Sequence, residues 1–354
     1  MRMHHAALVV GTLTISGSAA LMAQQGATPP ARTAPAGMNW AYAIAPAPAA
    51  APATGGARAG GAGGAAPAPD PTPRQLPGSA LQYTAAQIRD FFGPADWYPQ
   101  DHPPMPDIVG KGRRPEARAC AMCHMPNGKG RPENAGVAGL PVEYFVQTMN
   151  DFRSGARASA ESRKGNTNLM IQIAKAMTPE EIKAAADYFG SMRWTPWITV
   201  KETARVPVMR SQAGMWIPVE PEMTEPIGTR VIETPTDVER TEQFRDPRSG
   251  FIAYVPVGSV RKGEALVVRG GNGRTVACGG CHGTDLQGLG PVPGLAGRSP
   301  SYLARQMYDM KAGARRGTWS ALMGPVVERL TDEDYVNIAA YLASRPASAA
   351  SVAR

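Results

Sequence analysis

Two five-residue motifs contain all four cysteines of this 354-residue chain. The first is CAMCH, from Cys120 to His124, and the second is CGGCH, from Cys278 to His282. In each motif the two cysteines stand three positions apart, and a histidine directly follows the second. Any fold of this chain must therefore present the same cluster, two thiols and an imidazole, twice.

The spacing Cys-x-x-Cys-His is typical of covalent haem attachment. Two thiols add across the vinyl groups on one edge of the porphyrin, and the adjacent histidine is held under the iron. A thioredoxin-like redox motif would need a βαβ pattern, which is absent here. A zinc site would need two more ligands of suitable type at each motif, yet only His4, His5 and His102 lie outside the motifs. A disulfide within each pair, the default in an oxidising compartment, leaves the histidines unexplained.

We therefore predict two haem c groups as cofactors. The predicted attachment residues are Cys120 and Cys123 for the first haem and Cys278 and Cys281 for the second, with His124 and His282 as iron ligands.

The motifs lie inside an internal repeat. An offset of 158 positions carries Cys120 onto Cys278 and holds without a gap to Arg157 and Arg315, after which the first copy has five extra residues. Apolar residues recur every three or four positions in 142–152 and 300–310, a spacing that predicts amphipathic helices. Thr178 and Thr331, each followed three positions later by an acid, predict capped closing helices. Each copy is therefore expected to be a small helical domain of about ninety residues.

The repeat also selects candidates for the sixth iron ligand. Methionine usually packs in cores, and the chain has 17. Met170 and Met323 match each other and precede the two closing helices by similar distances. Met149 and Met307 also match, but they fall within amphipathic stretches typical of core packing. We predict Met170 and Met323 as ligands; His102, in a proline-flanked stretch, is a weaker alternative.

The N-terminal part of the chain predicts export. Residues 1–23 combine a short basic start with an uncharged apolar stretch and small residues, as in a signal peptide; an uncleaved membrane anchor is the alternative. Residues 24–78 are rich in Ala, Pro and Gly and are expected to form a disordered tether. The expected location is the periplasm.

Between the two copies, residues 194–258 are rich in β-branched and aromatic residues with frequent proline, which predicts short strands. The chain is thus divided into a signal peptide (1–23), a linker (24–78), a first domain (79–193), a connecting segment (194–258) and a second domain (259–354).

The net charge argues for protein partners rather than nucleic acid. The formal charge is +8, and without residues 1–23, whose only charged residue is Arg2, it is +7 from 36 basic and 29 acidic residues. The basic residues form no long runs, so nucleic-acid binding is disfavoured. The second domain carries 12 basic and 7 acidic residues, which favours redox partners with acidic docking surfaces.

With its two motifs, its helical repeats and the paired methionines, the chain resembles class I cytochromes c, and the tandem arrangement is similar to dihaem cytochrome c4. The resemblance covers roughly 107–192 and 259–345. It implies a mainly α fold, His124/Met170 and His282/Met323 as axial pairs, and electron transfer. It also implies that a proline carbonyl orients the histidine; Pro293 matches that position, and the first copy has Ala135 there.

Three functions follow as hypotheses. The main one is a carrier of single electrons between a donor dehydrogenase or quinol oxidase and a terminal acceptor, in association with a membrane-bound oxidase or dehydrogenase. The second is an electron-transfer subunit of a dehydrogenase complex, held by 194–258. The third is a dihaem enzyme, a peroxidase or a sulfur-oxidising enzyme, which would need one open iron.

Overall fold

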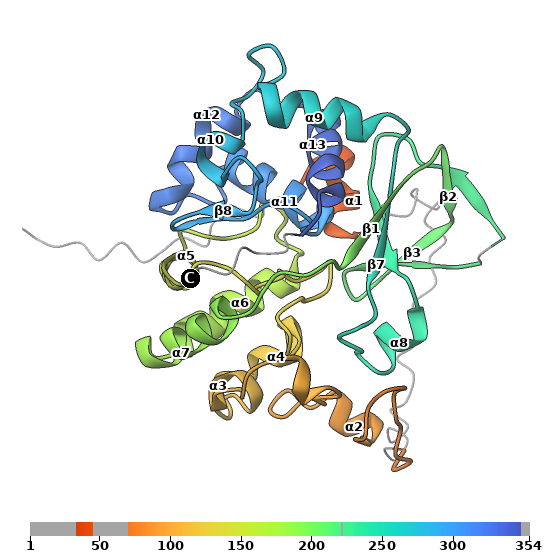
Figure 1. Ribbon diagram of the computed structural model, residues 1–354, viewed down its shortest axis with the longest axis vertical. Coiled ribbons are helices and arrows are strands. Elements are labelled where there is room, and N and C mark those ends of the chain that lie inside the picture. Colours follow the sequence, from red (N-terminus) through yellow and green to blue (C-terminus); the bar gives the residue numbers. More distant parts are fainter. Residues whose placement is uncertain (1–32, 45–69, 221, 348–354) are drawn as a thin grey trace, which may run out of the picture. The chain divides into compact units, whose positions relative to one another are not determined.

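The computed structural model describes residues 33–44, 70–220 and 222–347 (Figure 1). The predicted signal peptide, 1–23, lies outside these residues. Within them, no helix is long and apolar enough to cross a membrane.

The first haem domain is built from short helices around three longer ones. Its elements are α2 (Ala85–Ile88), η2 (Pro99–Asp101), α3 (Asp107–Gly110), α4 (Cys120–His124), α5 (Val142–Ser154), α6 (Gly165–Ala176) and α7 (Pro179–Gly190). The periodic apolar residues of α5 and α7 face one core, in which Phe145 and Phe189 stack with ring centroids 6.1 Å apart. The helix predicted over 142–152 is therefore present, and its apolar face is buried as expected.

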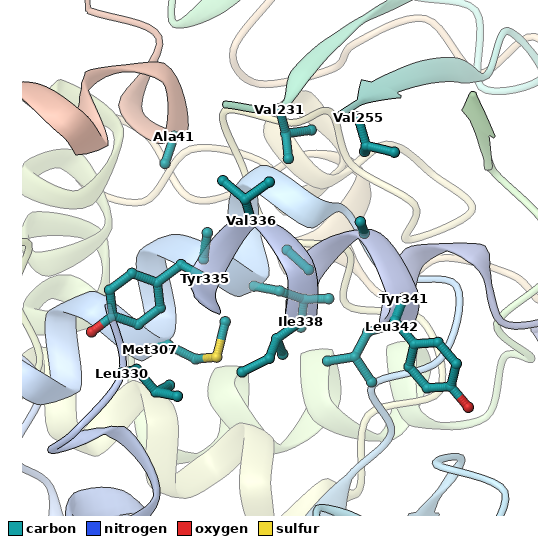
Figure 2. Packing of buried hydrophobic residues seen from close by; sticks show 14 of the residues in the cluster. Ala41, Val231, Val255, Met307, Leu330, Tyr335, Val336, Ile338, Tyr341 and Leu342 are labelled. Atoms are coloured by element: carbon teal, nitrogen blue, oxygen red, sulfur yellow. The ribbon is translucent and has the colours of Figure 1, made fainter. Parts of the chain in front are cut away.

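The second domain repeats this plan with small differences. Its elements are α9 (Ser259–Arg269), α10 (Gly279–His282), β8 (Gly288–Leu289), β9 (Val292–Pro293), α11 (Pro300–Lys311), η3 (Thr318–Met323), α12 (Gly324–Val327) and α13 (Asp332–Ser344). Helix α9 crosses α13 so closely that a Cβ at Gly263 would lie 1.9 Å from the carbonyl oxygen of Asn337. Figure 2 shows the apolar side chains of α13, among them Val336, Ile338 and Leu342, in this core.

Both closing helices begin with the predicted capping boxes. The side chain of Thr178 accepts from the Glu181 amide while Glu181 accepts from the Thr178 amide. Thr331 and Asp334 make the same reciprocal pair at α13. The shorter aspartate side chain therefore still closes the box, and both helices start where the sequence predicts.

The connecting segment contains the predicted short strands. They are β1 (Ile198–Glu202), β2 (Arg205–Pro207), β3 (Met209–Gln212), β4 (Met215–Pro218), β5 (Thr224–Pro226), β6 (Ile232–Pro235) and β7 (Phe251–Val255), with α8 (Val238–Glu242) before β7. One sheet has the order β1-β7-β6, with β1 parallel and β6 antiparallel to β7. The other four strands pair as β2-β5 and β3-β4.

Part of the predicted tether is structured, so the prediction of a free spacer over all of 24–78 is too broad. Residues 33–44 form η1 (Ala36–Met38) and α1 (Asn39–Tyr42), and α1 contacts α11 (Figure 1). The side chains of Met38, Trp40 and Tyr42 are buried in the core of the second domain, and Figure 2 shows Ala41 facing the same cluster. Residues 70–78 are also described, whereas 24–32 and 45–69 lie outside the described residues.

Tyr42 is expected to contribute strongly to stability. Its ring is 1% exposed, and its hydroxyl donates to Asp309 Oδ1 over 2.9 Å. Tyr42→Ala should lower the free energy of unfolding by about 3–5 kcal/mol, as large-to-small core changes do. Tyr42→Phe should cost only about 1–2 kcal/mol, the loss of one hydrogen bond to a buried carboxyl. Denaturant unfolding of the haem-loaded variants measures both values, and equal losses would contradict this assignment.

Candidate haem sites

The first Cys-x-x-Cys-His motif forms the short helix α4, which brings both thiols and the imidazole to one face. His124 is held by a hydrogen bond of 2.8 Å from Nδ1 to the carbonyl oxygen of Ala135. A carbonyl only accepts, so Nδ1 carries the proton and Nε2 keeps its lone pair for a metal. The motif therefore presents the tautomer that an iron ligand needs.

The second motif has the same arrangement. Nδ1 of His282 donates to the carbonyl oxygen of Pro293 over 2.7 Å. Ala135 and Pro293 occupy matching positions of the repeat. Since the acceptor is a main-chain oxygen, alanine serves at this position as well as proline does.

Burial controls the ionisation of these groups. Burial lowers the pKa of His124 and of His282, so both imidazoles are neutral at pH 7. Burial, with a smaller contribution from the second cysteine of each motif, raises the pKa of Cys120 to about 12 and of Cys278 to about 11. Because the thiolate is the form that attacks disulfides, these two thiols are poor partners for thiol exchange.

A cavity of the first domain brings its predicted ligands together. His124 and Met170 line the same space, Met170 from α6 and His124 from α4. Cys120 and Cys123 line an adjoining part, which shares both His124 and Met170. The walls between them are apolar and include Phe145, Met149 and Phe189.

In the second domain the predicted residues gather on one core. Cys278 and Met323 both pack, partly buried, against the cluster of α9, α11 and α13. The segment before Cys278 is tied to the segment after Met323, because Thr275 Oγ1 donates to the Val326 carbonyl over 2.7 Å. His282 is 9% exposed.

The residues fit haem c. Each site offers two thiols on one short helix, an imidazole with Nε2 available, and a methionine brought to the same cavity or core. The part of the first cavity that its cysteines do not line has three basic residues, Arg157, Lys164 and Arg305, and two acidic ones, Glu133 and Asp309. An apolar pocket with an excess of basic residues at one part matches a porphyrin with two carboxylates.

His102 is engaged elsewhere. Its Nε2 lies 3.1 Å from Asp96 Oδ1, and its Nδ1 lies 2.9 Å from the Pro103 carbonyl oxygen. Burial lowers the pKa of His102, but its hydrogen bonds to Asp96 and to the Pro103 carbonyl, with the charges of Asp96 and Asp101, together raise that pKa overall. With both ring nitrogens bonded, His102 is a structural residue of the stretch before α3 rather than an iron ligand.

The haem domains meet through reciprocal arginine–tyrosine bonds that the sequence analysis did not anticipate. Arg157 donates to the Tyr302 hydroxyl over 3.0 Å, and Arg315 donates to the Tyr144 hydroxyl over 2.8 Å. In the repeat, Arg157 matches Arg315 and Tyr144 matches Tyr302. Each domain therefore contributes one arginine and one tyrosine, at equivalent positions, to the contact. The same arginine and tyrosine occur in both copies of the repeat, and this could have been read from the sequence. The repeat alone does not show which of its matched residues contact the other domain.

The surroundings of the two motifs differ. In the first domain, Arg118 lies over the Phe91 ring at 4.0 Å, and the Ala119 amide donates to the Phe91 carbonyl over 2.9 Å. Arg245, from the connecting segment, donates to the Met122 carbonyl. Residues before α3 and after α8 therefore cover the first motif. Around the second motif, large apolar side chains are exposed instead: Val276 (51%), Leu289 (60%) and Leu322 (78%).

Comparison with known proteins shows the family of this chain. The cytochrome c family model matches residues 109–193 and 262–346. A cytochrome c-552 from Acidithiobacillus ferridurans is 36% identical over 64% of this chain and 73% of the relative. A thiosulfate dehydrogenase electron acceptor from Thiomonas intermedia is 27% identical over 66% of this chain and 82% of the relative. Cytochrome c4 from Stutzerimonas stutzeri is 38% identical over 85 residues, 22% of this chain and 40% of the relative.

These matches place one cytochrome c domain on each attachment motif and imply two covalent haem c groups per chain. The relatives are electron-transfer proteins, and the partners of such a chain are other redox proteins. The chain belongs to the cytochrome c family, as a dihaem electron carrier homologous to cytochrome c4 and to the electron acceptors of thiosulfate dehydrogenases.

Proposed function

We propose that this chain is the dedicated electron acceptor of an exported dehydrogenase that oxidises an inorganic sulfur compound, with thiosulfate as the first candidate. One observation carries the proposal: the thiosulfate dehydrogenase electron acceptor of Thiomonas intermedia aligns with this chain over 240 residues, which are 66% of this chain and 82% of the relative. This similarity supports the second hypothesis from the sequence, a subunit that serves one dehydrogenase, over a general carrier. The reaction belongs in the periplasm, where the predicted signal peptide would deliver the chain.

In this function Met170 and Met323 would be the sixth ligands. A thioether ligand together with a neutral imidazole would close the iron to substrates and raise its reduction potential, and haem held by these residues would supply one-electron chemistry at each site. The chain's own residues attach the porphyrin edge, keep Nε2 of each histidine available through the Ala135 and Pro293 carbonyls, and exclude water with apolar walls.

The dehydrogenase is proposed to dock on the apolar face of the second domain, defined by Val276, Leu289 and Leu322. Val276 lies two residues before Cys278, Leu289 lies in β8, which contacts α10, and Leu322 precedes Met323. These residues surround the second attachment motif, whereas the first is covered by the chain itself. With 12 basic and 7 acidic residues, the second domain suits a partner with an acidic rim around its own redox centre.

A charge placed on this face should slow electron entry. Leu289→Glu should lower the second-order rate of reduction by the dehydrogenase at least tenfold, or about 1.4 kcal/mol, because it puts a buried like charge against an acidic partner. The matched control is Val257→Glu, which changes an apolar residue of the connecting segment that is at least as exposed as Leu289. Stopped-flow reduction measures both rates; equal rates for the two variants would place the docking surface elsewhere.

The function itself is tested by mixing the oxidised dihaem protein with thiosulfate and catalytic amounts of a thiosulfate dehydrogenase. Reduction of both haems, with none when either reagent is omitted, is the expected result. Reduction by a quinol-oxidising complex, but not by the dehydrogenase, would identify a general respiratory carrier instead.

A further inference from the structure

We propose that Lys164, together with Arg157, binds a propionate carboxylate of the first haem, which gives that haem a cationic partner that the second haem lacks. The proposal depends on the presence of the haem and is independent of which dehydrogenase supplies the electrons.

The shape of the cavity determines which end of the haem reaches Lys164. Cys120 and Cys123 lie at one part of the space, and Lys164 and Arg157 line the part away from them. In haem the two propionates project from the edge opposite the vinyl groups. Attachment through the two cysteines therefore directs the propionates toward the cationic end.

Lys164 is a buried cation without a partner. Its residue is 5% exposed, and its Nζ has no hydrogen-bond partner among the described residues. Burial, with a smaller contribution from the charge of Arg305, lowers the pKa of Lys164 to about 7, and the charges of Glu133 and Asp309 partly oppose this shift. An ammonium held without an anion in such a place is strongly destabilising. A propionate in the same cavity removes that cost.

The two arginines that also line the cavity differ in the hydrogen bonds that they already make. Arg305 gives both terminal nitrogens to main-chain oxygens, those of Ala41 and Pro132. Arg157 is buried and donates only to neutral groups: Thr148, Tyr302 and Gln306. Arg157 therefore has charge to offer a carboxylate, while Arg305 is fixed in the surrounding wall.

Glu133 is the competing partner for Lys164. A Cβ built on Gly214 would lie 3.0 Å from Glu133 Cβ and 3.4 Å from Lys164 Nζ, so both border the same point. However, Glu133 Oε1 already accepts from Arg131 Nε over 2.6 Å. One oxygen of Glu133 thus has its own guanidinium, whereas Glu133 Oε2 and Lys164 Nζ are both without a hydrogen-bond partner among the described residues, so Lys164 keeps its donors for the propionate.

The second domain has no equivalent of Lys164. The stretch from Ala158 to Met170 has 13 residues, whereas the matching stretch from Arg316 to Met323 has eight and contains no lysine. The five extra residues of the first copy thus lie in the segment that contains Lys164. Arg157, in contrast, has its counterpart in Arg315. An effect of Lys164 should therefore be confined to the first haem.

The test compares Lys164→Gln with Lys164→Arg in the dihaem protein, with Lys175→Gln as the control. Lys175 is an exposed lysine on α6 of the same domain, so its change removes the same charge. The readouts are the midpoint potential of each haem and the carboxylate bands of ¹³C-labelled haem propionates in redox infrared difference spectra.

Lys164→Gln should lower the midpoint potential of the first haem and shift one propionate band, because a cation beside haem favours the reduced, less positive iron. Lys164→Arg should leave both near wild type, and Lys175→Gln should change neither. If Lys164→Gln leaves the propionate bands unmoved, Lys164 is a partner of Glu133 and the proposal is wrong. Failure of Lys164→Arg to restore either readout would also overturn it.

Discussion

Replacing Met323 by alanine is expected to lower the midpoint potential of one haem by roughly 0.1–0.3 V, part of the about 0.8 V that axial ligands control. A thioether stabilises the reduced iron, and its loss leaves water or an open position. The altered haem should then bind carbon monoxide, which a six-coordinate iron excludes. Spectro-potentiometry under carbon monoxide measures both effects.

Met170→Ala should do the same to the other haem, because the two methionines match in the repeat and Met170 lines the cavity of His124. The control is Met149→Leu, which changes a buried methionine on α5 that packs beside the cavity but is assigned to the core. Met149→Leu should leave the potential nearly unchanged. Carbon monoxide binding in Met149→Leu, or its absence in Met170→Ala, would show that the ligand is misassigned.

The second large effect is expected for Cys120→Ala. Covalent attachment at the first haem should fall to a single thioether or be lost, while the second haem stays fully attached. Denaturing gels stained for haem, with mass spectrometry of the chain, count the groups bound. Cys278→Ala is the matched variant and should affect only the second haem. Full double attachment in Cys120→Ala would contradict the attachment residues.

The haem domains were predictable because their signals are local and repeated. The capping boxes at Thr178 and Thr331 and the apolar spacing of 142–152 each determine a helix within a few residues of sequence. Two copies of each signal reinforced the prediction. The short strands of 194–258 followed from β-branched residues between prolines, but their pairing did not, because strand order depends on contacts distant in the sequence.

The segment 33–44 shows where composition misleads. Its neighbours are almost all Ala, Pro and Gly, so an average over 24–78 predicts a chain that cannot bury a core. Yet the stretch MNWAY places Met38, Trp40 and Tyr42 in the second domain, and α1 is held there by α11. Twelve residues suffice because three large side chains bury most of their surface, a local signal that the average conceals.

The orientation of His124 shows a different limit. A family proline is absent from the first copy, yet Ala135 supplies the same carbonyl at 2.8 Å. A main-chain acceptor depends on the path of the backbone and not on the side chain, so residue identity was a poor guide. The same holds for Lys164, whose pKa depends in part on the charges of Arg305 and Asp309 of the other domain.

The central claim, that both irons are closed and serve electron transfer, is tested most directly by the optical spectrum of the purified protein. The oxidised and reduced forms should be recorded with and without carbon monoxide. Two covalent low-spin haems, a methionine–iron charge-transfer band and no response to carbon monoxide are the predicted result. A haem that binds carbon monoxide in the wild-type protein would contradict the account and point to an enzyme with one open iron.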